Sequence, residues 1–279
     1  MNQMGRDREA YNLARNYLLE LRVRGLDSQL LEKYLHFSER APRPASIALI
    51  YRRLLESAQN ANMKAGVIGG AIGGVDKLGS LLCDFQPAAV LDKYHNEWNR
   101  ILDDIVEKLR PRGKIRRTER GLWPKYCRTI LSGARFLAQF STVDDFYGWV
   151  DVFDNDDRVR TALPLLLSRE ISGFGLALSC DFLKELGYAN FAKPDVHLCD
   201  IFIGLALCPE DSDDYEVLKA VVRVARNCGV KPYNVDKLFW LIGSGNFYGD
   251  PQIGESGRIG NHKKMFIAFA RRKLRSLEA

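Results

Sequence analysis

Apolar residues recur at steps of three and four positions along nearly the whole chain, and the alternation typical of a half-buried strand is almost absent. Residues 11–21 show this pattern with Leu13, Tyr17 and Leu21, and residues 90–109 show it over a longer stretch. Steps of three and four place side chains on one face of an α-helix. The sequence therefore predicts an all-α fold in which Gly and Pro mark the helix ends.

The helix boundaries follow from the places where the pattern stops. Pro111 and Gly113 end the longest run, and Pro42 and Pro44 precede the run that begins at Ile47. We expect helices over residues 11–21, 47–55, 90–109, 124–140, 142–152, 161–170, 176–186, 196–207, 214–228, 235–242 and 263–277.

Composition limits the class of protein. A chain of 279 residues, 46% of them hydrophobic, can bury a sizeable core in one or two domains. Its six cysteines form no Cys-x-x-Cys pair, so we expect reduced thiols, no zinc or iron–sulfur centre and no cofactor. The start of the chain does not resemble a signal peptide, and an apolar run of about 18 residues is absent. These features predict a cytoplasmic protein without a membrane partner.

Positive charge is gathered in blocks. The net charge is +6, and residues 108–128 contain nine basic residues and one acid. Residues 258–275 add seven basic residues and no acid, whereas residues 144–157 carry six acids and no base. A positive face suited to a phosphate backbone is one interpretation, and solvated loops are the other.

The glycine-rich segment 65–79 fits neither the dinucleotide-binding nor the P-loop spacing, and no strand pattern precedes it. Its small residues are better explained by two helices that approach closely, or by one helix that ends where another begins.

A short turn at Gly173-Phe174-Gly175 joins two of the predicted helices. The N–H groups at the start of the second helix lack intrahelical acceptors and suit a phosphate. The two glycines permit a left-handed step and a close approach, and Phe174 is expected to pack inward. By itself, such a turn is equally well explained as a plain connection between helices.

Two segments together resemble the helix-hairpin-helix DNA glycosylase superfamily: ISGFGLA at residues 171–177 and KPDVHL at residues 193–198. That superfamily has a hairpin of this form with a catalytic Asp further along the chain, and here Asp195 follows Gly175 by 20 residues. The Pro-Asp-Val-His order is similar to the acidic segment of 8-oxoguanine DNA glycosylases. The segment LLESAQN at residues 54–60 is similar to the Leu-Ser-Ala-Gln of endonuclease III relatives. The resemblance spans residues 47–208.

The resemblance implies a fold and a set of site residues. Two helical domains would flank an active-site cleft, one of them formed by residues 1–56 packing with residues 187–279. The other would be residues 57–186, ending in the helix-hairpin-helix at about 161–186. Asp195 would be catalytic. The implied DNA contacts are Gly173, Phe174, Gly175, Leu176, Ala177 and His197, with Gln59 and Asn60 entering the gap left by an extruded base.

The chain also departs from the superfamily pattern. Members that cut the DNA backbone carry a Lys two positions after the second hairpin glycine, where this chain has Ala177. With Ala177 in place of that lysine, Lys193 is the possible catalytic amine, because a partly desolvated lysine can act as a nucleophile. The four-cysteine cluster of endonuclease III is absent as well, so a metal-free protein is expected.

The chemistry assigned to Asp195 needs a single carboxylate. Breaking an N-glycosidic bond builds positive charge on the sugar, which a carboxylate stabilises while it activates a water. A position at a helix N-terminus favours the ionised form, although it suits a plain helix cap equally well. His197 is interpreted as a DNA contact or a structural residue. Asp236 and Trp240, within the polar and aromatic run 235–245, are the pocket candidates.

The sequence thus predicts a monomeric, monofunctional DNA glycosylase with no protein partner. Its substrate would be double-stranded DNA with a damaged or modified base, in repair or in defence against modified phage DNA. Three alternatives stay open: a non-catalytic helix-hairpin-helix DNA-binding protein, a glycosylase and lyase that uses Lys193, and a purely structural helical scaffold.

Overall fold

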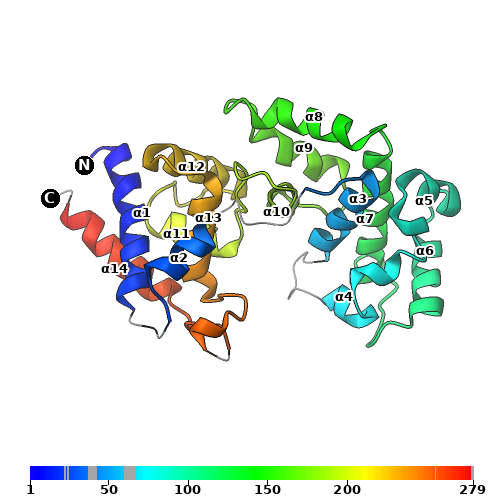
Figure 1. The fold of residues 1–279 in the computed structure, drawn as a ribbon, viewed down its shortest axis with the longest axis horizontal. Helices are drawn as coiled ribbons and strands as arrows, with labels where there is room; N and C mark the ends of the chain where they lie inside the picture. The colour runs from blue at the N-terminus through cyan, green and yellow to red at the C-terminus, as the bar shows by residue number, and fades with distance from the viewer. Residues whose placement is uncertain (22, 24, 37–42, 60–66, 255, 278–279) are drawn as a thin grey trace. The chain divides into compact units, whose positions relative to one another are not determined.

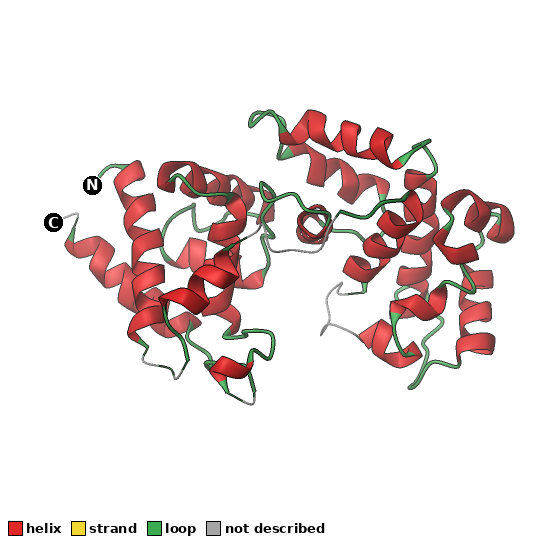
Figure 2. Cartoon of the chain, viewed as in Figure 1, coloured by secondary structure: helices red, strands yellow, loops and turns green. Residues whose placement is uncertain are grey.

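The computed structural model describes residues 1–21, 23, 25–36, 43–59, 67–254 and 256–277. In these residues all regular structure is helical, apart from one isolated antiparallel bridge between Asn246 and Arg258 (Figure 2). The all-α prediction is confirmed.

The contacts divide the chain into two compact units, each described here by itself. The terminal unit comprises Met1–Ala41 and Ala189–Ala279, and the central unit is Pro42–Tyr188. Residues 42–56, which the sequence grouped with the chain ends, belong to the central unit. The reason is that helix α3 (Ile47–Ala58) packs against α7 (Leu122–Leu137) and α10 (Leu176–Glu185).

The terminal unit is built around α13 (Pro232–Ser244), which contacts every other α-helix of the unit (Figure 1). Phe239 of α13 is fully buried and meets the rings of Phe202 and Phe266 edge-on or tilted, at centroid distances of 5.3 and 6.1 Å. The surrounding elements are α1 (Gln3–Glu20), α2 (Ser28–Leu35), α11 (Val196–Gly204), α12 (Asp214–Cys228), α14 (Lys263–Ser276) and the short 3₁₀ turn η4 (Pro251–Ile253).

An ion pair joins α1 to α12 in this unit. Asp7 of α1 is fully buried, and its carboxylate accepts from Nε and Nη2 of Arg223 at 2.9 and 3.1 Å. The side-chain amide of Asn227 donates to the same carboxylate at 2.7 Å. Because each polar atom of Asp7 has a charged or amide donor, the pair fixes α1 on α12.

The central unit is built around α7, which packs against α3, α5, α6 and α9. Most α7 side chains are buried, Tyr126 and Ile130 among them. The other elements are α4 (Val67–Ile72), η1 (Val75–Leu78), η2 (Cys83–Phe85), α5 (Pro87–Tyr94), α6 (Trp98–Asp104), η3 (Ile105–Leu109), α8 (Val143–Asp154) and α9 (Ala162–Glu170).

Two helix predictions differ from the structure. The single helix expected over residues 90–109 is wrong, because His95 and Asn96 take left-handed φ values of 48° and 64° and separate α5 from α6. Helix α2 was missed, although Asp27 caps it through a 2.8 Å hydrogen bond from the Leu30 N–H. An Asx cap before closely spaced leucines is the signal that would have found it.

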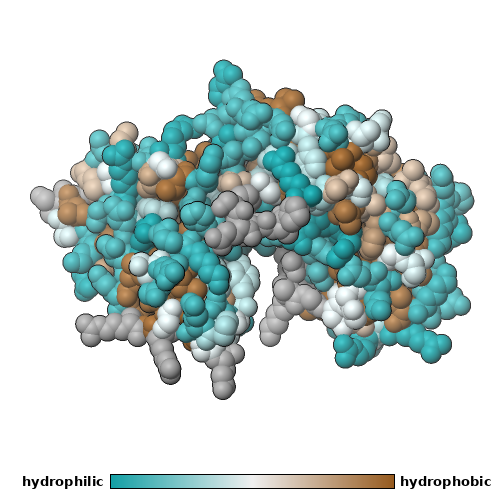
Figure 3. Space-filling model, viewed as in Figure 1, coloured by the Kyte–Doolittle hydropathy of each residue, from teal (hydrophilic) through white to brown (hydrophobic). Residues whose placement is uncertain are grey.

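The face drawn in Figure 3 is mostly hydrophilic, with apolar residues in small separate patches. None of the helices in the described ranges is long and apolar enough to cross a membrane.

Candidate functional site

Asp195 lies at the N-terminus of α11 in the terminal unit and caps that helix. Its Oδ1 accepts hydrogen bonds from the N–H groups of His197 at 2.9 Å and Leu198 at 3.2 Å. Within the described part of the chain, no donor reaches Oδ2. One oxygen therefore holds the half-buried carboxyl group in place, and the other is left for a ligand or a water.

The surroundings of Asp195 raise the pKa of its carboxyl group above the ordinary value of an aspartate. Burial is the largest cause, and the nearby charge of Asp236 is the second. The charges of His197 and Lys193 and the Leu198 N–H act in the opposite direction. The helix N-terminus thus favours the ionised form, as expected, but burial and Asp236 outweigh it.

Asp236, 41 positions after Asp195, reaches the same site from α13. Its side chain is buried, 3% exposed, and its Oδ2 accepts the backbone N–H of Lys193 at 2.9 Å. The carbonyl of Lys193 in turn accepts the N–H of Asp195 at 2.8 Å. These two bonds fix the turn that leads into α11. The structure therefore brings together three residues singled out from the sequence: Asp195 as the catalytic candidate, Lys193 as the lyase candidate and Asp236 as a pocket candidate.

Replacing Asp236 with Asn is expected to lower the pKa of the Asp195 carboxyl group. The amide keeps an oxygen for the Lys193 N–H but removes the negative charge that disfavours ionisation of Asp195. NMR titration of the carboxyl ¹³C of Asp195 measures this directly. An unchanged midpoint in the Asp236→Asn protein would contradict the coupling.

His197 packs against α13 rather than projecting freely from α11. A Cβ added at Gly243 would lie 2.6 Å from the His197 Cβ and 3.2 Å from its Nδ1, so this glycine makes room for the ring. The Nδ1 atom is buried and has no hydrogen-bond partner in the described residues. Any contact of His197 with DNA would therefore be made by the other ring nitrogen.

Trp240, the second pocket candidate, belongs to an aromatic stack that sequence reasoning missed. Its ring stacks on Tyr248 at a centroid distance of 5.1 Å, and Tyr248 stacks on Tyr34 at 6.1 Å. Lys237, 5% exposed, donates from Nζ to the Tyr248 hydroxyl at 2.6 Å, and its Nζ lies 5.2 Å from the centroid of the Trp240 ring.

The position of Tyr248 in this stack is unusual. The residue has a left-handed φ of 53° and is 60% exposed, although its ring stacks with those of Tyr34 and Trp240. Trp240 follows Asp236 by one helical turn, so the two lie on one face of α13. The spacing of Lys237 and Trp240 could have placed them together, whereas no local signal links either residue to Tyr34 or Tyr248.

The turn between α9 and α10 lies in the central unit and contains the Gly-x-Gly segment. Phe174 is 2% exposed and meets the Phe182 ring at 6.0 Å, which confirms its inward packing. Its N–H donates to the Ile171 carbonyl at 3.0 Å and is not available to DNA. Only Gly173 takes a left-handed φ, +79°, so the expectation that Gly175 also needs this freedom is wrong.

Gly175 serves a different purpose. It is exposed, and a Cβ added there would meet nothing within 4 Å. It precedes α10 without a side-chain cap, and no described group accepts the N–H groups of Gly175, Leu176 or Ala177. The Leu176 side chain is buried and Ala177 is half-buried, so both offer their backbone rather than their side chains.

The turn is held by α7. Thr129 donates from its hydroxyl to the Ser172 carbonyl at 2.6 Å, and the Ser172 N–H donates to the Ser132 hydroxyl at 2.9 Å. A Cβ at Gly173 would lie 3.0 Å from the Thr129 hydroxyl and 4.0 Å from the Lys125 carbonyl. The backbone of the turn thus sits directly on the N-terminal half of α7.

Gln59 is engaged within the central unit. It ends α3, and its Oε1 accepts the Gly69 N–H of α4 at 3.2 Å. This contact joins α3 to the glycine-rich segment, and it would have to break before Gln59 could enter a DNA duplex. The second candidate of that pair, Asn60, lies outside the described residues.

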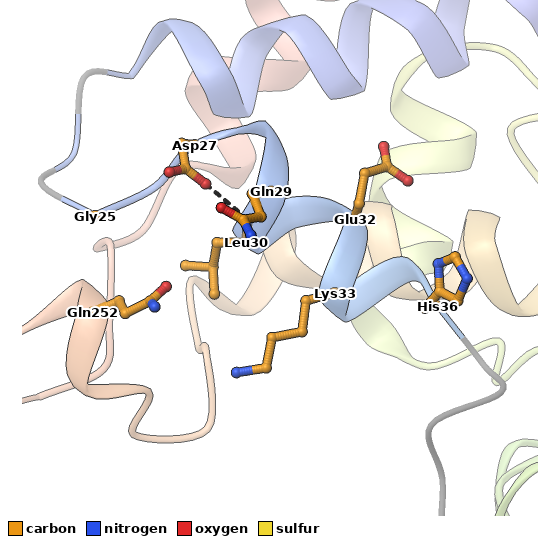
Figure 4. A pocket seen from close by; sticks show the side chains of 8 residues that line it. All are labelled: Gly25, Asp27, Gln29, Leu30, Glu32, Lys33, His36 and Gln252. Carbon is orange, nitrogen blue, oxygen red and sulfur yellow. Dashed lines mark hydrogen bonds between the residues drawn. The ribbon is translucent and has the colours of Figure 1, made fainter.

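A separate hollow of about 740 Å³ opens beside α2 in the terminal unit (Figure 4). Acidic and basic side chains both line it, including Asp27, Glu32 and Lys33, and it contains none of the site residues expected from the sequence. In the residues the structure describes, no group of three or more His, Cys, Asp and Glu side chains is arranged to hold a metal ion.

The chain matches no protein-family model, and comparisons with curated proteins and with solved structures likewise find no match.

Proposed function

We propose that this protein is a monofunctional DNA glycosylase, which hydrolyses the N-glycosidic bond of a damaged or modified base and leaves an abasic site. The observation that carries the proposal is the Asp195 carboxyl group. One of its oxygens is fixed at the start of α11, the other is left without a described donor, and the group is half-buried beside Asp236. The order of the hairpin turn and Asp195 in the chain supports it.

In this reaction Asp195 acts on the sugar. As the base departs, positive charge develops at the anomeric carbon, and the free oxygen of the ionised carboxylate stabilises that charge. The same oxygen accepts a proton from the attacking water. A carboxyl group with a raised pKa is a better proton acceptor once it is ionised, so the burial of Asp195 serves the second role.

The target nucleotide has to leave the DNA stack before Asp195 can act on it, at a cost of a few kcal/mol. The aromatic stack of Trp240, Tyr248 and Tyr34 offers faces on which a displaced base can stack. The exposed N–H groups that begin α10 suit a phosphate of the DNA backbone, and Gly175 leaves open space before them.

Base release tests the proposal. Duplexes that each contain one oxidised, alkylated or hypermodified base, together with modified phage DNA, are incubated with the protein, and abasic sites are then cleaved with alkali. Alkali-dependent breaks that require Asp195 are expected. If every substrate stays intact while salt-sensitive DNA binding is observed, the non-catalytic DNA-binding alternative is favoured.

Lys193 defines the alternative of a combined glycosylase and lyase. Its charge acts on the Asp195 carboxyl group, so its amine lies within electrostatic reach of the site. Strand breaks that appear without alkali, with borohydride trapping of the DNA that Lys193→Gln abolishes, would favour this second activity.

Alanine substitutions at the two hairpin glycines are predicted to affect protein stability and DNA binding differently. Gly173→Ala is expected to destabilise the protein by about 1–2 kcal/mol, because its φ is left-handed, and to weaken DNA binding with it. Gly175→Ala should leave the melting temperature unchanged but weaken DNA binding, since its Cβ would occupy the space in front of α10. Thermal unfolding and DNA titrations measure both effects. Unchanged DNA affinity in Gly175→Ala would contradict a phosphate at this turn.

A further inference from the structure

A cationic pocket lies at the N-terminus of α7 in the central unit. Its volume is about 520 Å³, and it has contributions from α4, from the loop that follows η3 and from the first turn of α7. The lining residues on which the argument depends are Arg112, Lys114, Arg116, Arg120, Leu122 and Trp123. In the whole lining, four side chains are positively charged and none is negatively charged.

Arg112, which lines the pocket, is held in place by two hydrogen bonds. Its N–H donates to the Ala71 carbonyl at 2.9 Å, and its guanidinium donates to the Gly70 carbonyl at 2.8 Å. These two bonds tie the basic loop to the end of α4. These bonds anchor the loop without any contribution from Lys114, Arg116 or Arg120.

Lys114, Arg116 and Arg120 are exposed, and no carboxylate pairs with any of them in the ranges that the structure describes. Arg117, between them in sequence, differs because it pairs with Asp103 at 2.5 Å. Three unpaired like charges around one concavity repel each other, and an anion placed among them relieves that repulsion.

The start of α7 adds backbone donors to the same pocket. Gly121 precedes this 16-residue helix without a side-chain cap, and no acidic residue occupies its first turn. No described group accepts the N–H of Leu122 or Trp123, and both residues line the pocket. The positive end of the helix dipole therefore points toward the site that the three cations surround.

We propose that this pocket binds a backbone phosphate of the same DNA duplex that the α9–α10 turn contacts; the inference rests on the proposed DNA-binding function. The two sites share α7, since Thr129 of this helix holds Ser172 of the turn. Leu122 and Thr129 are seven residues apart, roughly 10 Å along the helix at about 1.5 Å per residue. One DNA strand advances about 3.4 Å per nucleotide. A separation of this size is within the span of a few nucleotides, so one duplex can reach both sites.

The test compares two triple variants by DNA titration over a range of salt concentrations. Lys114→Ala/Arg116→Ala/Arg120→Ala removes the pocket cations. The control, Arg100→Ala/Arg135→Ala/Arg158→Ala, removes three exposed cations of the same unit that each already have a neighbouring partner. The pocket variant should bind DNA about tenfold more weakly and lose roughly one unit of the salt slope, and the control should lose much less.

A second measurement locates the phosphate. Single uncharged methylphosphonate linkages are placed one after another along each strand of the duplex. One position, distinct from the linkage that the Gly175→Ala protein ceases to sense, should weaken binding of the unaltered protein but not of the pocket variant. Arg116→Lys/Arg120→Lys, which keeps the charge, should retain the salt slope and shows that the loop tolerates substitution.

The outcomes separate this inference from the proposed function. Equal salt slopes in the pocket and control variants, or methylphosphonate profiles that do not differ between the unaltered protein and the pocket variant, would overturn the phosphate site even if base release is observed. A reduced slope without base release from any substrate would support the pocket and contradict the glycosylase. Loss of the slope in the charge-preserving variant would also overturn the inference.

Discussion

Replacing Asp195 with Asn is expected to lower the rate of base release by about 10²–10⁴-fold. The amide occupies the same space but cannot stabilise the developing charge on the sugar or accept a proton from water. Asn is also a good N-cap, so its side-chain oxygen keeps the bonds from His197 and Leu198. Single-turnover measurements with enzyme in excess report the chemical step, and DNA titrations should show affinity close to that of the unaltered protein.

The same substitution should not reduce stability at neutral pH. Because the folded-state pKa of Asp195 is raised, the folded protein binds more protons than the unfolded chain between the ordinary aspartate pKa and that raised value. Stability therefore falls as pH rises through this window, and above it the ionised carboxylate is destabilising. Thermal unfolding should give Asp195→Asn an equal or higher melting temperature. Asp195→Ala, which loses the cap, should be about 1 kcal/mol less stable than the Asn variant.

Asp213 offers a matched control in the same unit. It caps α12 through a 2.9 Å bond from the Glu216 N–H, much as Asp195 caps α11. Asp213→Asn should leave base release unchanged. If Asp195→Asn retains full activity while the Ala variant merely unfolds earlier, Asp195 is a helix cap and the proposed catalytic role is wrong.

Gly243→Ala is expected to lower the rate of base release by displacing Asp195. The new Cβ would lie 2.6 Å from the Cβ of His197, so the first turn of α11 has to move. Overpacking of this kind costs about 1–3 kcal/mol, and the gain of about 1 kcal/mol from replacing a helical glycine offsets only part of it. Because Asp195 is two residues before His197, it moves with that turn. A displacement near 1 Å can reduce the rate by roughly 10²-fold.

Gly148→Ala in α8 is the control for that substitution. Gly148 is exposed within a helix, and an added Cβ would meet nothing within 4 Å. This variant should be more stable by about 0.5–1 kcal/mol and fully active. If Gly243→Ala unfolds at the same temperature as the unaltered protein and keeps its activity, the contact between His197 and α13 does not position Asp195.

The features that the sequence predicted depend on local patterns. Helical periodicity located most helices, and the Gly-x-Gly turn predicted both the end of α9 and the inward packing of Phe174. The segment from Pro194 to His197 placed Asp195 at a helix start, as observed. The break at His95 was not predicted, because neither His95 nor Asn96 is a strong helix breaker and the apolar spacing continues past them.

Contacts between distant segments could not be predicted in the same way. The bond between Asp236 and the Lys193 N–H joins residues 43 positions apart, and the stacking of Tyr34 on Tyr248 crosses most of the chain. Such contacts depend on how α13 packs within the terminal unit, which no local spacing encodes. The direction of the Asp195 pKa shift was missed for this reason, since its causes are burial and the charge of Asp236.

The division of the terminal unit between the two ends of the chain has a consequence for biosynthesis. Asp7 leaves the ribosome 216 residues before Arg223, its partner in the ion pair. At about 5–20 residues per second, this interval lasts roughly 10–40 s. Throughout that interval α1 lacks a complete α12, and the described helices of the central unit, the last of which ends at Glu185, have all been made before Arg223 emerges. The segments of the hairpin turn and the cationic pocket are therefore made first, and Asp195 can enter its folded environment only after α12 and α13 have also been made.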